Sequence, residues 1–249
     1  MSVYQSLLNH KQNKLKNLAV LIDPDQHDDE LHSLFLQSKQ NDISLFLVGG
    51  SLVSKGITKD CVRDLKSWGA ENVILFPGNE IQLCEDADAL LFMSLISGRN
   101  SEYLIGKQVT AAPWIKKSGI ESLPTGYMLV ESGKLTSANY ISGTLPIPND
   151  KPDIAAATAI AGELLGMNNL YLDAGSGAKQ PVPAQIIKSV NKNTDSILWV
   201  GGGIRSAKEA KTAWTNGADI VVVGNGLFEI PDLIEEISAE MQILNQLII

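Results

Sequence analysis

The sequence contains few of the residues that bind transition metals or form disulfides. Its 249 residues include two cysteines, Cys61 and Cys84, and three histidines, His10, His27 and His32. The cysteines form no Cys-x-x-Cys pair, and no histidine lies at the spacing of a zinc site. These patterns argue against a disulfide-stabilised fold and against a zinc centre. They predict two reduced thiols in a cytoplasmic protein.

Positive charge and long apolar runs are also scarce. The chain has 28 acidic against 20 basic side chains, a net charge of −8, which argues against broad nucleic-acid binding because that function needs a basic surface. No apolar run approaches the roughly 20 residues that cross a bilayer, and the polar, basic segment 1–16 does not resemble a signal peptide. Walker, Rossmann and Gly-x-Ser-x-Gly patterns are missing, so nucleotide hydrolysis and dinucleotide redox chemistry have little support.

A regular series of apolar, strand-like runs dominates the remaining pattern. Eight runs alternate with helix-like segments, and most are nearly continuous in Val, Ile and Leu, as is typical of parallel strands buried on both faces. The length of 249 residues matches the roughly 250 residues of one (β/α)8 barrel. We therefore predict an α/β fold, a modified TIM barrel formed by residues 1–249 as a single domain. The predicted strands are Asn17–Asp23, Ile43–Gly49, Asn72–Phe76, Ala89–Ser94, Thr125–Val130, Asn169–Asp173, Ile197–Gly201 and Ile220–Gly224.

Helix signals are clear in six segments, and two intervals interrupt the alternation. Only Pro77–Asp88 separates the third and fourth strands, so the third helix is predicted to be reduced or absent. The polar interval Glu131–Lys151 contains glycine and proline and fits either a lid or wall on the active face or a plain surface loop. Ser206 and Asp153 are the predicted N-caps of their helices. The predicted helices are Asp28–Gln40, Lys59–Trp68, Asp153–Leu165, Pro183–Val190, Ser206–Asn216 and Asp232–Gln246.

Three glycine-rich stretches follow the last three predicted strands. They are Tyr171–Ala178, Gly201–Gly203 and Gly224–Gly226. Glycine lets backbone N–H groups approach an anion closely, and many barrels bind phosphate in the loops after strands seven and eight. The pattern predicts a phosphate site, with tight turns alone as the alternative. Asp173 ends its strand where catalytic residues of parallel-sheet enzymes gather, although an exposed acid in an ordinary turn would look the same.

Two further strand ends contain oxygen ligands. The first strand ends in Asp23 and Asp25, and the second is followed by Ser51. Carboxylate and hydroxyl oxygens are suitable partial ligands for Mg²⁺, which takes its other ligands from water and substrate phosphates. The alternative is structural: the aspartates form an Asp-Pro turn and Ser51 caps the next helix.

Together these stretches resemble the geranylgeranylglyceryl phosphate synthase family, in its archaeal and Bacteroidetes branch. The resemblance extends over nearly the whole chain in the family's order, and the six motifs together are specific although each glycine motif alone is weak. They are Leu21–Asp25, Val48–Ser51, Leu75–Asn79, Tyr171–Ala178, Val200–Ile204 and Val223–Asn225. The family is a modified TIM barrel without the usual third helix, which agrees with the short Pro77–Asp88 interval.

The resemblance implies Mg²⁺-dependent transfer of a prenyl group from geranylgeranyl diphosphate to the C3 hydroxyl of sn-glycerol 1-phosphate. It makes Asp23 and Ser51 the magnesium ligands. Many archaeal members have Glu where this chain has Asp173, which shortens the carboxylate's reach by one methylene. Asp173 is expected to orient the glycerol hydroxyl and to accept its proton. The implied glycerol phosphate site is Tyr171, Leu172, Asp173, Ala174, Gly175, Ser176, Gly177, Gly202, Gly203, Gly224 and Asn225.

Two other functions remain compatible with the sequence. One is a phosphate-binding barrel that isomerises or cleaves a sugar phosphate, and the other is a phosphate-sensing or scaffold protein that kept the fold. The acid and hydroxyl at the first two strand ends favour prenyl transfer, because an epimerase would need paired acids or metal-binding histidines. The length of the prenyl chain is not encoded in these motifs. We also expect a homo-oligomer, on the resemblance more than on the apolar C-terminal segment 243–249.

Overall fold

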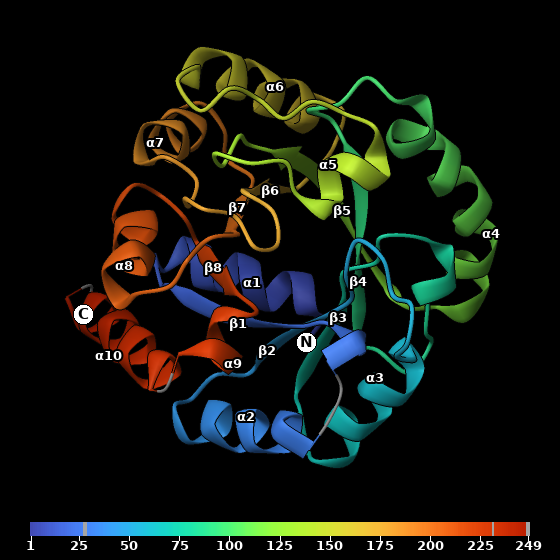
Figure 1. Cartoon of the computed structure of the whole chain (residues 1–249), viewed down its shortest axis with the longest axis vertical. Coiled ribbons are helices and arrows are strands. Elements are labelled where there is room, and N and C mark those ends of the chain that lie inside the picture. The colour runs from blue at the N-terminus through green and yellow to red at the C-terminus, as the bar shows by residue number, and fades with distance from the viewer. Residues whose placement is uncertain (27–28, 231, 248–249) are drawn as a thin grey trace.

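The computed structural model describes residues 1–26, 29–230 and 232–247, which form a closed parallel barrel (Figure 1). Strands β1 to β8 pair in sequence order, and β8 pairs with β1. All eight predicted strands are confirmed, but β5 begins four residues earlier than predicted, at Glu121, and includes Pro124. The strands are β1 Asn17–Ile22, β2 Leu45–Val48, β3 Asn72–Leu75, β4 Ala89–Leu95, β5 Glu121–Leu129, β6 Asn169–Asp173, β7 Ile197–Gly201 and β8 Ile220–Val223.

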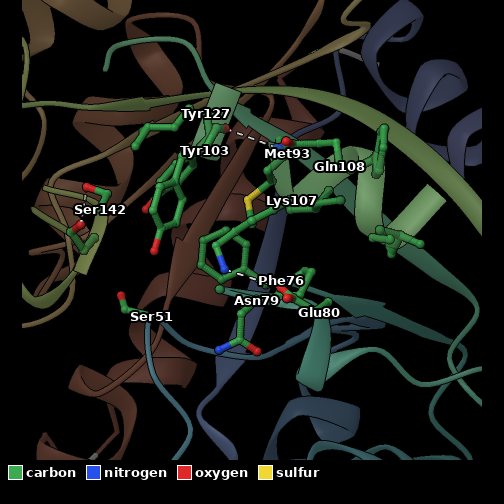
Figure 2. Close-up of a pocket in the computed structure, with 18 of the residues that line it drawn as sticks. Ser51, Phe76, Asn79, Glu80, Met93, Tyr103, Lys107, Gln108, Tyr127 and Ser142 are labelled. Carbon is green, nitrogen blue, oxygen red and sulfur yellow. Dashed lines mark hydrogen bonds and ion pairs between the residues drawn. The ribbon is translucent and has the colours of Figure 1, made fainter. Parts of the chain in front are cut away.

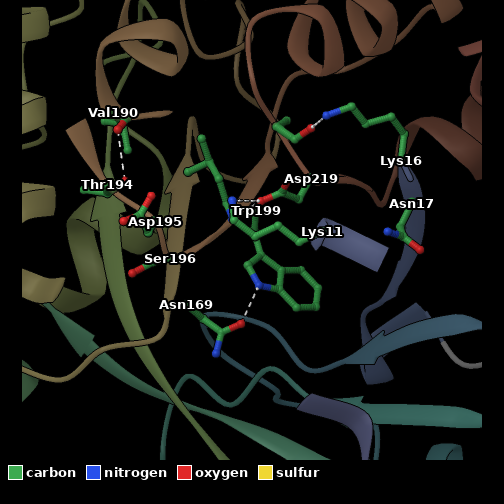
Figure 3. Close-up of polar contacts among 12 residues, drawn as sticks. Lys11, Lys16, Asn17, Asn169, Val190, Thr194, Asp195, Ser196, Trp199 and Asp219 are labelled. Atoms are coloured by element: carbon green, nitrogen blue, oxygen red, sulfur yellow. Dashed lines mark hydrogen bonds and ion pairs between the residues drawn. The ribbon is translucent and has the colours of Figure 1, made fainter. Parts of the chain in front are cut away.

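Alternate residues of each strand enter two separate hydrophobic cores. In β8, Ile220 and Val222 lie in the barrel interior, whereas Val221 and Val223 pack between the barrel and the helices. Both sets are buried, which explains why the runs show no polar alternation in the sequence. Trp199 lies inside the barrel, and its indole N–H donates to Asn169 Oδ1 at 3.0 Å (Figure 3).

Helices surround the barrel except between β3 and β4. That connection contains only a single 3-10 turn, Glu80–Gln82, so the predicted loss of the third helix is confirmed. Other short elements are a 3-10 turn at Pro24–Gln26 and a π-helical turn at Glu102–Gly106. The helices are α1 Val3–Gln12, α2 Asp29–Gln40, α3 Thr58–Ser67, α4 Lys107–Ser118, α5 Ser137–Ser142, α6 Pro152–Leu164, α7 Ala184–Asn193, α8 Ala207–Thr215, α9 Gly226–Glu229 and α10 Leu233–Gln246.

The helix predictions failed at four elements and at one cap. Helices α1, α4, α5 and α9 were not predicted, and the Asp153 N-cap is wrong. Lys151 occupies that position without a side-chain hydrogen bond, and Pro152 begins the helix. The Ser206 cap is confirmed, because its hydroxyl accepts from Glu209 N–H. The predicted α2 start at Asp28, together with His27, Ile248 and Ile249, lies outside the described residues.

Helix α1 closes the amino-terminal end of the barrel, behind the strands in Figure 1. Its Val3 and Leu7 join the interior core. The Glu121 carboxylate accepts from the N–H groups of Val3 and Tyr4 at 2.7 and 2.9 Å, and Lys11 pairs with Asp219 at 2.8 Å (Figure 3). These contacts leave the opposite end, where the carboxyl ends of the strands meet, available for a site. No helix in the part of the chain that the structure describes is long and apolar enough to cross a membrane.

Candidate active site

A polar cavity opens at the carboxyl ends of β1, β2, β6, β7 and β8. It combines the acids, the hydroxyl and the glycine loops that the sequence placed in separate motifs. The predicted site residues that line it are Asp23, Ser51, Tyr171, Asp173, Gly175, Ser176, Gly177, Gly202, Gly203, Gly224 and Asn225. Strand order explains the convergence, because parallel strands of one barrel deliver their carboxyl ends to one face.

Asp173 lies in the wall of this cavity and is only 7% exposed. Its Oδ1 accepts from Gly175 N–H at 2.6 Å, and its Oδ2 accepts from the Tyr127 hydroxyl. Burial raises the pKa of the carboxyl, while these two hydrogen bonds oppose the rise. A carboxylate with a raised pKa is the better proton acceptor for an alcohol.

Two tyrosines complete the surroundings of Asp173, and the sequence analysis found only one of them. Tyr171 and Tyr127 are register partners on β6 and β5, so their rings lie side by side with centroids 5.5 Å apart. Burial and the charge of Asp173 hold the pKa of both hydroxyls well above the ordinary value, so both remain donors. Tyr127 could have been predicted as a site residue from its place near the end of a barrel strand, where inward-pointing polar side chains reach the active face.

The glycine loops after β7 and β8 present free backbone amides to the cavity. Within the described residues, the N–H groups of Gly202, Gly203, Gly224 and Asn225 donate no hydrogen bond. Gly202 and Gly203 have φ of +82° and +73°, and a Cβ on Gly202 would lie 2.6 Å from Asp173 Oδ1. Both positions therefore require glycine, and the unpaired amides are suited to an anion.

Two predicted substrate residues do not reach the cavity. Leu172 and Ala174 belong to the core between the barrel and the helices, where they are almost fully buried. The cause is the two-residue period of a strand, which turns them away from Tyr171 and Asp173. Arg205 does line the cavity, but its guanidinium donates to the carbonyl of Ala178 at 3.1 Å and so braces the loop after β6.

Asp23 and Ser51 face the same cavity from the residue after β1 and from the loop after β2. Asp23 Oδ1 accepts from Asp25 N–H at 3.0 Å, so the predicted Asp-Pro turn is present. Ser51 caps no helix, because the residue before α3 is Ile57. Burial raises the pKa of Asp23, and no described Lys or Arg pairs with it. Since no three described His, Cys, Asp or Glu side chains cluster to hold a metal alone, a cation here would need substrate or water oxygens as well.

Asp25 has a different role from Asp23. Its carboxylate turns away from the cavity and accepts from the N–H groups of Ser54, Lys55 and Gly56 at 2.7–3.0 Å. These bonds hold its pKa far below the ordinary range. Asp25 therefore fixes the β2–α3 connection, which contains Ser51.

An apolar groove adjoins the polar cavity and is lined in part by the β3–β4 connection that lacks a helix (Figure 2). Ser51, Phe76 and Tyr127 belong to the walls of both, so the two spaces share one boundary. Lys107 and Glu80 pair at 3.4 Å beside the groove. Its other lining residues are mainly apolar and come from β3–β5, α4 and α5; they include Leu83, Leu90, Met93, Leu95, Tyr103, Ala111, Ile115 and Leu129.

The interval Glu131–Lys151 forms one wall of this groove. It folds into α5, whose Ala138, Ile141 and Ser142 line the apolar space. Thr136 packs against Gly175, because a Cβ built on Gly175 would lie 2.5 Å from the Oγ1 of Thr136. The interval thus joins the groove to the Asp173 loop and is not a detached surface loop.

Comparison with known proteins agrees with this geometry. The PcrB family model matches residues 10–241. Geranylgeranylglyceryl phosphate synthase of Spirosoma linguale is 48% identical and covers 98% of each chain, and that of Thermococcus kodakarensis is 38% identical over 97% of this chain and 96% of its own. The crystal structure of (S)-3-O-geranylgeranylglyceryl phosphate synthase from Thermoplasma acidophilum with sn-glycerol-1-phosphate superposes with a TM-score of 0.90, at 28% identity over 99% of both chains. The chain therefore belongs to the PcrB family, and the resemblance to geranylgeranylglyceryl phosphate synthases of bacteria and archaea is confirmed.

Proposed function

We propose that this protein transfers the geranylgeranyl group of geranylgeranyl diphosphate to the C3 hydroxyl of sn-glycerol 1-phosphate, forming an ether. The shared boundary of a phosphate-suited cavity and an apolar groove is the observation that carries the proposal. It brings a hydroxyl held in one space next to the first carbon of a chain held in the other. Relatives from bacteria and archaea are named geranylgeranylglyceryl phosphate synthase, and the Thermoplasma acidophilum structure contains sn-glycerol-1-phosphate.

The acceptor is held by its phosphate at the glycine loops. Unpaired amides of Gly202, Gly203, Gly224 and Asn225 supply donors to its oxygens. Tyr171 and Asp173 then orient the glycerol hydroxyls from β6. Only one enantiomer places its C3 hydroxyl toward the groove, and misplacing a hydrogen-bonded hydroxyl leaves a buried partner unpaired. We therefore expect a strong preference for sn-glycerol 1-phosphate over the sn-3 isomer.

Asp173 acts as the base in this reaction. A bond forms between the C3 oxygen and C1 of the prenyl group as the bond from C1 to the diphosphate oxygen breaks. The hydroxyl proton passes to Asp173, whose raised pKa favours that transfer. Tyr127 holds the carboxylate in position through its hydroxyl. The diphosphate departs with the electron pair of the broken bond.

Asp23 and Ser51 are the residues we assign to Mg²⁺. The half-buried Asp23 carboxylate fits a cation, since its raised pKa reflects burial without a described cationic partner. When bound, Mg²⁺ offsets the charge of the leaving diphosphate. Ser51 lines the groove as well as the cavity, and Asp23 lies against Gly50, which also lines both. This position supports contact with the diphosphate of a chain held in the groove and not with glycerol phosphate.

Incubation with labelled sn-glycerol 1-phosphate, geranylgeranyl diphosphate and Mg²⁺ tests the activity. A lipid-extractable product is expected, and its absence beside an active control enzyme would exclude the function. Asp23→Ala should abolish turnover while calorimetry still detects glycerol phosphate binding. The matched control is Asp153→Ala, which removes an exposed acid from the first turn of α6. This variant should keep both turnover and glycerol phosphate binding.

We also propose a cytoplasmic homo-oligomer. Cys61 and Cys84 are both buried and unpaired, as suits a reducing compartment. Ile243 near the end of α10 and Leu247 directly after it are 49 and 79% exposed, and this apolar surface supports a contact between copies. Light scattering that gives the 26.8 kDa mass of one chain would refute the oligomer.

A further inference from the structure

Five large apolar side chains are exposed on the face that contains the active site. Ile57, Ile81, Leu135, Tyr140 and Leu145, which we call the rim, are between 59 and 88% exposed. All five lie in connections that follow the carboxyl ends of β2, β3 and β5. Figure 1 shows α5, which contains Tyr140, in front of the barrel on the side opposite α1. Large exposed apolar side chains gathered on one face mark an interaction surface.

The rim is continuous with the apolar groove on both of its sides. Ile81 directly follows Glu80, and Tyr140 directly precedes Ile141; Glu80 and Ile141 both line the groove. Any surface that covers the rim therefore also meets the entrance to the groove.

The rim backbone has internal hydrogen-bond partners, so the apolar side chains are held outward by defined structure. The carboxylate of Asp25 accepts from three consecutive N–H groups just before Ile57. Asn79 Oδ1 accepts from Ile81 N–H at 3.0 Å. Thr136 and Asn139 form a capping box at the start of α5. These satisfied polar groups lower the cost of moving the rim out of water.

We propose that the rim docks the protein onto a lipid bilayer, from which the prenyl diphosphate enters the groove and to which the product returns. The proposal rests on the proposed function for the choice of a lipid partner. A prenyl diphosphate and a prenylated glycerol phosphate both combine a long apolar chain with an anionic head, so both partition into bilayers. Exposed Lys55 and Lys134 adjoin the rim and are placed to meet lipid phosphates, while the acid beside the rim, Glu80, is paired with Lys107. A second protein copy on the rim would instead cover the groove entrance.

Vesicle sedimentation tests the docking surface without any substrate. Wild-type protein should sediment with vesicles of equal parts phosphatidylcholine and phosphatidylglycerol. The triple variant Ile57→Ser, Ile81→Ser, Leu135→Ser should lose about tenfold in affinity. The control is Leu164→Ser with Leu165→Ser. It removes two equally exposed leucines at the end of α6 that leads into β6, on the amino-terminal side of the barrel, and should bind as wild type does.

Turnover separates the docking proposal from the proposed function. With dispersed short-chain geranyl diphosphate the triple variant should keep its rate, whereas with geranylgeranyl diphosphate in vesicles its rate should fall about tenfold. Vesicle binding without any prenyl transfer would refute the proposed function and would still support the rim as a docking surface. Equal vesicle affinity of the triple variant and wild type, no wild-type binding, or dissociation of an oligomer by the triple variant would overturn the docking proposal. Circular dichroism confirms that each variant is folded.

Discussion

Replacing Tyr127 with phenylalanine removes one hydrogen bond from the side chain that we assign as the base. The Tyr127 hydroxyl donates to Asp173 Oδ2, while Gly175 N–H keeps its bond to Oδ1 at 2.6 Å. The ring itself still packs beside Phe76 and Tyr171. A hydrogen bond to a charged group contributes about 1.5–3 kcal/mol, and one between neutral groups about 0.5–1.5 kcal/mol. The loss of stability in Tyr127→Phe should therefore depend on whether Asp173 is ionised.

The direction of this pH dependence follows from the pKa of Asp173. Burial raises that pKa in the folded protein, and the bond from Tyr127 opposes the rise. Below the unfolded-state pKa, Asp173 is protonated in both states and the variant loses only a neutral bond. As the pH rises through the folded-state pKa, the buried carboxylate lacks one donor, so the variant's deficit in free energy of unfolding grows. The same change raises the pKa of Asp173 further.

Urea unfolding at acid and at neutral pH measures the deficit, and the pH profile of kcat measures the base. We expect a deficit of about 2 kcal/mol at neutral pH and a smaller one at acid pH. kcat should fall about ten- to a hundredfold, with the acidic limb of its profile moved to higher pH. Tyr103→Phe is the matched control, because the Tyr103 hydroxyl donates to the neutral carbonyl of Ile141 at 3.2 Å. The free energy of unfolding that this variant loses should not vary with pH. A Tyr127→Phe deficit that is the same at both pH values, with an unshifted kcat profile, would refute the reasoning.

Three further substitutions test separate parts of the site. Gly202→Ala should weaken glycerol phosphate binding by about tenfold or more in calorimetry, because the new Cβ would meet Asp173 and the backbone φ is +82°. The control is Gly119→Ala, where φ is +74° but the surrounding space is open; it should lose only about 1 kcal/mol of stability and no glycerol phosphate affinity. Asp25→Ala should free the amides of residues 54–56, and kcat should fall because the loop that contains Ser51 is no longer fixed. Since the pKa of Asp25 is depressed, the stability that Asp25 contributes is present above the unfolded-state pKa and is lost as the pH falls. Urea unfolding of the variant should no longer show that pH dependence. Ala111→Phe places a ring in the groove, so product analysis should show a shorter longest prenyl chain, and an unchanged chain-length range would mean that the prenyl group binds elsewhere.

The barrel was predictable because its strands are buried on both faces. Runs such as Ile220–Val223 read as continuous apolar segments in the sequence, and the same residues divide between two cores in the structure. The missed elements lack that signal. Helix α1 contributes only Val3 and Leu7 as buried residues, and α5 is a six-residue helix inside a polar interval. Both are stabilised by tertiary contacts with the barrel, which a local pattern does not contain.

The sequence by itself determined the chemistry that each strand end could offer: acids after β1 and β6, a hydroxyl after β2 and glycines after β6, β7 and β8. Barrel closure alone decided which of these residues meet, because residues distant in sequence become neighbours only when strands pair in register. It placed Tyr127 on Asp173, turned Leu172 away from the cavity, and separated Asp25, which fixes a loop, from Asp23, which faces the cavity. The apolar groove was likewise a tertiary result, since its lining comes from strands and helices whose individual residues have no motif.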